Sequence, residues 1–231
     1  MFGMAKPRIL FCGYRKWALD IINAIAAPYK DKIDAVIIKS KDEYDEKIKD
    51  AKPELAFFIG WSWIIKDEIP RNVKKICLHP SPLPRYRGGS PLQHQIINGE
   101  KDSAVTYFIM DDAIDAGPIL WQQPFSLDGE LDEVFGRLTE LGKKGLKDIL
   151  DKYLATGKLD GKKQDESEAT SYKRRTPKES EIKTEDFKNF TSRQIYDKIR
   201  ALQDPYPNAF VVCKDGTKLY LQKAKTEEEK E

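Results

Sequence analysis

Apolar residues fall into short runs that alternate with segments of helical periodicity. Residues 8–12 form an apolar run that ends at Gly13, and the stretch WALDIINAIAA then repeats apolar side chains at helical spacing. Two further apolar runs, at 33–38 and 55–59, flank the charged helical stretch KDEYDEKIKD. Strands that alternate with helices in this way predict a parallel sheet with helices packed on its faces.

The middle of the chain continues this pattern. A fourth predicted strand at 73–78 delivers His79 at its carboxyl end, where open α/β sheets place ligands and catalytic groups. A predicted helix at 91–98 follows, and two strand-like runs at 104–109 and 119–123 then flank the loop MDDAIDAGP. The expected fold class is therefore α/β, with a Rossmann-like, mostly parallel sheet.

The last third of the chain predicts a smaller appendage. A long amphipathic helix at about 131–154 precedes the polar stretch GKLDGKKQDESEATS, which is typical of a loop or linker. A helix at 192–202 and a hairpin around the turn KDGT, formed by 209–213 and 218–222, are predicted beyond it. The expected units are a first domain at 1–157, a linker at 158–176 and a small C-terminal subdomain at 177–231.

Charge and cysteine content narrow the class of protein. The 40 basic and 38 acidic residues nearly cancel, so nucleic acid is not the expected partner. No apolar run approaches the ~18 residues needed to span a membrane. Cys12, Cys77 and Cys213 lack the spacing of a disulfide framework or a metal site, which favours reduced thiols in the cytoplasm and no metal. The stretch FCGYRKWA has one glycine where a dinucleotide fingerprint needs three, so we expect a tight turn there.

Two stretches contain residues suited to chemistry. ICLHPSPLPRYRGGSPLQHQIING has three prolines within five positions, then two arginines and two glycines, and predicts a stiff loop that a ligand can approach closely. A proline-rich connection without a ligand fits the composition equally well. MDDAIDAGPI brings together Asp111, Asp112 and Asp115. If its turn faces the end of the fourth strand, Asp115 and His79 meet and can handle protons near neutral pH, although an aspartate in this context is more commonly a turn former.

Together, the HPSPLPRYRGG loop and MDDAIDAGPIL, about three dozen residues later, resemble the 10-formyltetrahydrofolate-dependent formyltransferases. The segments RRTPKES and IYDKIRALQDPYPNAF are similar to the tails of the nucleotide-sugar and methionyl-tRNA branches. The resemblance implies that His79 and Asp115 are catalytic. An acceptor amine would attack the formyl carbon, and His79 would stabilise the resulting oxyanion and assist proton transfer. Asp115 would orient or tune the imidazole and help to deprotonate the amine. His94 is expected to be structural or to lie at the rim of the site.

Cys77 departs from the family pattern, which usually has asparagine two residues before the histidine. An amide donates a hydrogen bond to an oxyanion, whereas a thiol is a weak donor, and loss of one such donor slows chemistry on the order of 100- to 1000-fold. Cys77 is therefore a candidate site residue that puts the rate in question. A small buried residue at the strand end is the simpler interpretation, preferred to a nucleophile.

The resemblance also implies two sets of binding residues. The expected folate contacts are Gly60, Trp61, Trp63, Pro82, Leu83, Pro84 and Asp111, although the tryptophans could equally be packing residues. The expected contacts of a phosphate-bearing acceptor are Arg85, Arg87, Gly88 and Gly89, unless this is simply a solvated basic loop.

Comparison of the branches favours a nucleotide-linked amino sugar as the acceptor. About 70 residues follow the polar segment, fewer than the β-barrel domain usual in methionyl-tRNA formyltransferases, whereas glycinamide ribonucleotide formyltransferase normally stops near the catalytic domain. A formyltetrahydrofolate hydrolase is expected to carry a regulatory domain before the first strand. The alternatives are a methionyl-tRNA formyltransferase-like enzyme, or a folate- or nucleotide-binding protein of this fold with little activity. The appendage could serve a homodimer.

Overall fold

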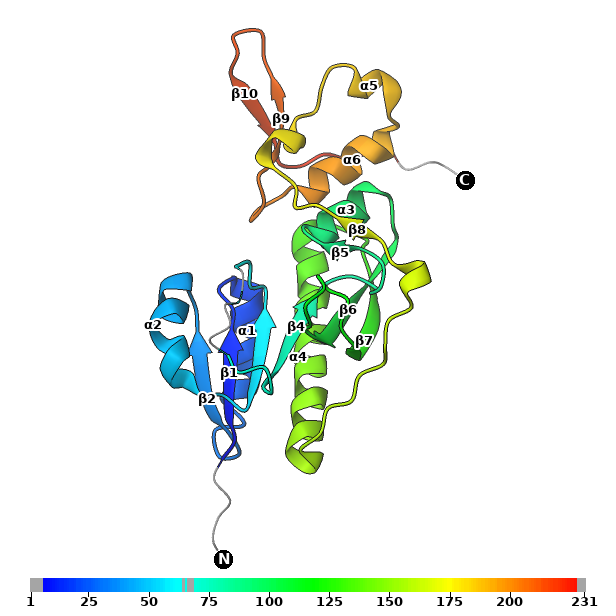
Figure 1. Cartoon of the computed structure of the whole chain (residues 1–231). Helices are drawn as coiled ribbons and strands as arrows, with labels where there is room; N and C mark the ends of the chain where they lie inside the picture. Colours follow the sequence, from blue (N-terminus) through cyan, green and yellow to red (C-terminus); the bar gives the residue numbers. More distant parts are fainter. Residues whose placement is uncertain (1–5, 64, 66–68, 228–231) are drawn as a thin grey trace, which may run out of the picture.

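A mixed sheet organises the first part of the computed structural model, which describes residues 6–63, 65 and 69–227 (Figure 1). Within those residues the strand order is β2-β1-β3-β4-β6-β7. The parallel strands are β1 (Arg8–Cys12), β2 (Asp34–Ile38), β3 (Leu55–Ile59) and β4 (Lys74–His79). The antiparallel strands are β6 (Asp102–Ile109) and β7 (Ile119–Ser126). The α/β class with a mostly parallel sheet is confirmed.

Helices cover both faces of the sheet, so its strands are apolar on both sides. Along β1, Ile9 and Phe11 face α1 (Lys16–Ala26) and α4 (Leu131–Thr156), whereas Leu10 and Cys12 face α2 (Lys41–Ala51). This alternation explains why the strand is a continuous apolar run rather than a polar and apolar repeat. Helix α4 packs closely against α1 because Gly142 has no side chain. A Cβ at Gly142 would meet Ile21 Cδ1 of α1 at 2.4 Å.

Several short elements have no clear signal in the sequence. They are β5 (Arg87–Gly88), β8 (Ser171–Tyr172), η1 (Glu166–Glu168), η2 (Pro177–Ser180) and α5 (Asp186–Asn189). The helix α3 (Pro91–Ile97) was predicted with almost the same bounds. Strand β5 pairs with β8 in parallel, although about eighty residues separate them.

The polar segment 158–176 lies along the first domain. Leu159 is buried, Lys162 forms an antiparallel bridge with Ile119, and the Gln164 side chain is 5% exposed. Figure 1 shows this segment running back along the β6 and β7 side of the sheet. It is irregular in conformation but fixed by packing, and the division of the chain into domains remains a proposal.

A small unit follows, built from α6 (Ser192–Ala201) and the hairpin of β9 (Ala209–Val212) and β10 (Lys218–Leu221). Its apolar core comprises Ile182, Ile195, Ile199, Leu202 and Ala209. Helix α6 packs against α3, which connects this unit to the first domain (Figure 1). In the part of the chain that is described, no helix has the length and apolarity needed to cross a membrane.

Candidate active site

His79 lies at the carboxyl end of β4 and is 6% exposed. Its Nε2 atom lies 2.8 Å from the carbonyl oxygen of Tyr86. Because a carbonyl only accepts, Nε2 must carry the hydrogen. The other nitrogen, Nδ1, lies 3.6 Å from Asp115 Oδ2 and holds the lone pair when the ring is neutral. The two residues singled out in the sequence therefore meet, with Nδ1 free to take a proton.

Asp115 is held from several directions. Its Oδ2 accepts a hydrogen bond of 2.8 Å from Gly88 N, and its backbone carbonyl accepts one from Gln164 Nε2 at 2.9 Å. The residue has φ of 52°, which is uncommon for a residue with a side chain. The adjacent turn requires Gly117, since a Cβ there would meet Ile109 O at 1.8 Å. The carboxylate therefore has a fixed position beside the imidazole.

Arg87 supports the turn of Asp115 indirectly, through Gln164. Its guanidinium donates to Gln164 Oε1 at 3.1 and 2.9 Å and to both carboxylate oxygens of Glu166 at 2.8 and 2.7 Å. Gln164 in turn donates to the carbonyls of Asp115 and Gly117. Burial and bidentate pairing occupy the Arg87 side chain, so its place in the structure is that of a support for the turn that carries Asp115. Segment 158–176 thus helps to build the site.

A cavity of about 770 Å³ opens beside His79, between the first domain and the C-terminal residues. Eight of the residues selected from the sequence line it: Gly60, Trp61, Trp63, Cys77, His79, Gly88, Gly89 and Asp115. Gly88 has φ of 93°, and a Cβ there would meet Tyr172 O at 2.3 Å. The absence of a side chain therefore lets the backbone of Gly88 approach that of strand β8 closely. The structure therefore brings residues of the HPSPLPRYRGG and MDDAIDAGPIL loops to one cavity.

The remaining selected residues lie away from the lining of this cavity. Pro82 and Arg85 line a separate hollow, where Arg85 pairs with Glu100. Leu83 is buried and is joined by a cis peptide bond to Pro84. Asp111 accepts a hydrogen bond from Ala113 N within its own turn. Their expected ligand contacts, like that of Arg87, stay predictions.

Several lining residues were not singled out in the sequence. They come from the turn after β1 and the start of α1, from the segment around β8 and from the turn after α6: Arg15, Trp17, Tyr172, Lys173, Arg174, Arg175 and Tyr206. The motifs RRTPKES and DPYPN were noted only as marks of the family tail. Nothing in their local pattern indicates that they face His79, because that depends on how α6 packs on α3.

The cavity wall is positively charged and aromatic. Arg15, Lys173, Arg174 and Arg175 line it, against the single carboxylate of Asp115 among the described lining residues. The indole Nε1 atoms of Trp17 and Trp61 are buried and have no hydrogen-bond partner in the described part of the chain. Such a wall suits an anionic ligand that carries flat rings.

Cys77 also lines this cavity, and its Sγ lies 3.6 Å from the carbonyl oxygen of Leu78. Burial raises the pKa of the Cys77 thiol, and the charge of Asp115 raises it further. The group therefore remains a protonated thiol near neutral pH, which argues against a nucleophilic role.

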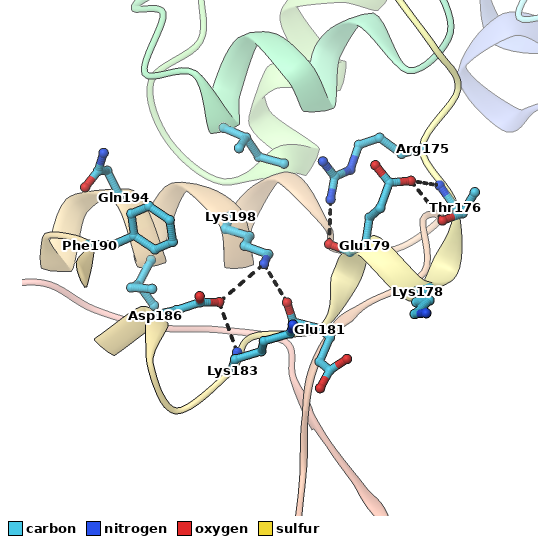
Figure 2. Close-up of a pocket in the computed structure, with 12 residues that line it drawn as sticks. Arg175, Thr176, Lys178, Glu179, Glu181, Lys183, Asp186, Phe190, Gln194 and Lys198 are labelled. Carbon is cyan, nitrogen blue, oxygen red and sulfur yellow. Dashed lines mark hydrogen bonds and ion pairs between the residues drawn. The ribbon is translucent and has the colours of Figure 1, made fainter. Parts of the chain in front are cut away.

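A second cavity, of about 680 Å³, lies within the C-terminal unit (Figure 2). Two of its cations contact its own loops: Lys198 Nζ donates to Glu181 O at 2.5 Å and lies 3.8 Å from Asp186 Oδ2, while Arg175 Nη2 donates to Glu179 O at 2.7 Å. Burial lowers the pKa of both Lys198 and Arg175. These contacts of Lys198 and Arg175 help to hold the loops of the cavity together.

Comparison with known families gives two matches along the chain. Residues 25–150 match the family described as formyl transferase, and residues 177–231 match the formyl transferase C-terminal domain. A methionyl-tRNA formyltransferase from Syntrophomonas wolfei is 32% identical over 216 residues, and one from Kosmotoga olearia is 34% identical over 174 residues. These matches cover 90% and 73% of this chain. The chain spans 66% and 53% of the length of these two curated relatives.

Solved structures share the fold. A methionyl-tRNA formyltransferase from Clostridium thermocellum is 32% identical with a TM-score of 0.74, covering 92% of this chain and 96% of that one. A sugar N-formyltransferase from a Shewanella species is 22% identical with a TM-score of 0.69, covering 96% and 98%. HypX from Aquifex aeolicus in complex with tetrahydrofolic acid is 19% identical with a TM-score of 0.74, covering 90% and 36%. The last two show likeness of fold alone.

Proposed function

Since the chain belongs to the formyl transferase family, we propose that it moves a formyl group from 10-formyltetrahydrofolate to the amino group of a nucleotide-linked amino sugar. The observation that most supports formyl transfer is one cavity that contains the His79 and Asp115 pair and has a positively charged, aromatic wall, whereas the choice of the sugar rests on the near-neutral charge of the chain. The acceptor and the roles of the residues are part of the proposal.

The proton chemistry follows from the two ring nitrogens of His79. Nε2–H is held by the Tyr86 carbonyl, which fixes the ring, and Nδ1 accepts the proton that the acceptor amine loses as it attacks the formyl carbon. The same proton passes to N10 of the folate as its bond to the formyl carbon breaks, which releases tetrahydrofolate. Asp115, at 3.6 Å, stabilises the imidazolium that forms. Positioned acid and base groups of this kind typically accelerate a reaction by about 100- to 10,000-fold.

The folate fits the tryptophan side of the cavity. The rings of Trp61 and Trp63 lie 4.8 Å apart, and Trp63 lies 4.6 Å from Tyr14, so the wall presents aromatic edges and faces. The buried Nε1 of Trp61, which has no partner among the described residues, is a donor for a ring acceptor atom. When bound, 10-formyltetrahydrofolate supplies an activated formyl carbonyl. The expected contacts Gly60, Trp61 and Trp63 all line this part of the cavity.

A methionyl-tRNA acceptor is the second candidate. The methionyl-tRNA formyltransferase relatives are 32% and 34% identical to this chain, whereas the sugar N-formyltransferase from Shewanella is 22% identical. The argument for the sugar is the near-neutral charge of the chain, since a tRNA-binding surface generally needs a basic footprint. Both acceptors carry an amine and phosphates, so the cavity wall suits either.

A competition between acceptors tests the proposal. The purified protein is incubated with 10-formyltetrahydrofolate and either a panel of nucleotide-linked 3-amino and 4-amino sugars or methionyl-tRNA, and tetrahydrofolate release and the formylated product are measured. Transfer to one sugar supports the proposal, and transfer to methionyl-tRNA alone favours the second candidate. Folate binding without transfer to either acceptor identifies a binding protein with little activity.

Replacing Cys77 with asparagine is expected to increase kcat by about 10- to 100-fold, because a hydrogen bond to a charged group contributes about 1.5–3 kcal/mol. An amide at this position lines the cavity near His79 and donates more strongly than a thiol. Steady-state kinetics of formyl transfer measure the change, with Cys77→Ala as the matched control that removes the thiol without adding a donor. An equal or lower kcat in a folded Cys77→Asn variant would show that this chain does not use a donor there.

A further inference from the structure

Arg15 occupies an unusual position in the wall of the main cavity. It follows β1, immediately before α1, and its guanidinium contacts two aromatic rings. The guanidinium carbon lies 5.2 Å from the centre of the Tyr14 ring and 5.6 Å from that of Tyr206. Tyr206 belongs to the turn after α6, so the two halves of the cavity wall meet at this side chain. The two cation–π contacts restrict the rotamers of Arg15.

The guanidinium of Arg15 has no acidic or hydrogen-bonding partner among the described residues. By contrast, Arg87 pairs with Glu166, and Arg193 and Arg200 share Asp197. Arg15 is half-buried, so part of its hydration is lost without replacement by a carboxylate. The two rings orient this cation at the wall of the cavity, and its N–H donors are not used within the described part of the chain. Such a group is preorganised to bind an anion from outside the chain.

We propose that Arg15 is the residue that anchors a phosphate group of the acceptor, an inference that rests on the proposed formyl transfer. Planar guanidinium donors match phosphate oxygens in pairs, and the flanking rings of Tyr14 and Tyr206 suit the flat base of a nucleotide. Strand β3 separates β1 from β4, so the end of β1 lies about 10 Å from the end of β4 by the usual strand spacing. A phosphate held on the β1 side of the cavity would leave room beside His79 for the part of the acceptor that carries the amine.

A folate also carries anionic oxygens, on the carboxylates of its glutamyl tail. The experiment therefore distinguishes binding of Arg15 to an acceptor phosphate from binding to the folate tail. Intrinsic tryptophan fluorescence is titrated with UDP, dTDP, GDP and ADP in one arm and with tetrahydrofolate in the other. The proteins are wild type, Arg15→Gln and Arg15→Lys. Lys16→Gln is the matched control. Lys16 is the next residue along the chain, its cationic side chain is 90% exposed, and it pairs only with Asp20 among the described residues.

The expected result is that at least one nucleoside diphosphate binds the wild type and that Arg15→Gln weakens this binding about 10- to 100-fold, with a smaller loss in Arg15→Lys. The affinity of the Arg15 variants for tetrahydrofolate is expected to equal that of the wild type. The Lys16→Gln variant is expected to bind both kinds of ligand with wild-type affinity. The assignment of Arg15 is overturned if no nucleoside diphosphate binds the wild type, if Arg15→Gln binds it equally well, or if only tetrahydrofolate binding weakens. Because these titrations need no turnover, failure of formyl transfer and failure of the Arg15 assignment give different results.

Discussion

Replacing His79 with asparagine is expected to lower kcat/KM for formyl transfer by about 100- to 10,000-fold. The asparagine side chain is shorter than histidine, so its amide does not reach the Tyr86 carbonyl that Nε2 contacts, and it has no lone pair able to accept a proton in place of Nδ1. Asp115 then faces an uncharged group and has no imidazolium to stabilise. The loss is expected mainly in kcat, because the other lining residues of the cavity are unchanged.

His94→Asn provides the control, as His94 is the other histidine of the sequence. Its Nε2 lies 2.9 Å from Lys173 O and its ring packs on Tyr172, so its contacts are structural. Release of tetrahydrofolate under identical conditions measures both variants, and thermal unfolding verifies that each is folded. If His79→Asn retained more than about a tenth of the wild-type kcat/KM, proton transfer by His79 would not be the main contribution to rate.

The order of strands and helices could be predicted because the apolar runs are short, continuous and bounded by glycine or charged helices. The position of His79 followed from the same pattern, since a strand that ends at Leu78 or His79 places the imidazole at the carboxyl edge of the sheet. The outer strands β6 and β7 run antiparallel, which their residue pattern does not distinguish from a parallel arrangement.

The site was harder to predict because several of its contacts join residues far apart in the chain. Arg87 looks like a ligand-binding arginine until Glu166, 79 positions later, is placed beside it. Arg15 looks like an ordinary surface residue in the turn after β1, and only the packing of the turn after α6 puts Tyr206 against it. Local periodicity contains no information on such contacts, since loop closure is determined by the whole fold.

The attachment of the C-terminal unit depends on a buried ion pair in α6. Arg200 and Asp197 are each 2% exposed, and Arg200 Nε donates to Asp197 Oδ1 at 2.6 Å. Arg200 Nη1 also donates to the carbonyls of Leu127 and Gly129, at 2.6 and 2.9 Å, in the segment that leads into α4. One side chain therefore satisfies three acceptors and links α6 to the first domain.

Arg200→Met is expected to lower the free energy of unfolding by about 3–5 kcal/mol, because it leaves the Asp197 carboxylate buried with reduced compensation and removes the donor for two carbonyls. The melting temperature should fall by about 6–20 °C for a chain of this size. The cavity also loses support, since α6 leads directly to Tyr206, so the KM for the acceptor should increase in the folded fraction.

Arg193→Met is the matched control for this prediction. Arg193 Nε donates to the other oxygen of the same carboxylate at 2.9 Å, but its side chain is 59% exposed. Water can replace that contact, so the expected cost is below about 1 kcal/mol. Denaturant titrations of the two variants compare a buried and an exposed partner of one aspartate. A loss below about 1 kcal/mol in Arg200→Met as well would show that the attachment of α6 depends on apolar packing and not on the bonds of Arg200 to the carbonyls of Leu127 and Gly129.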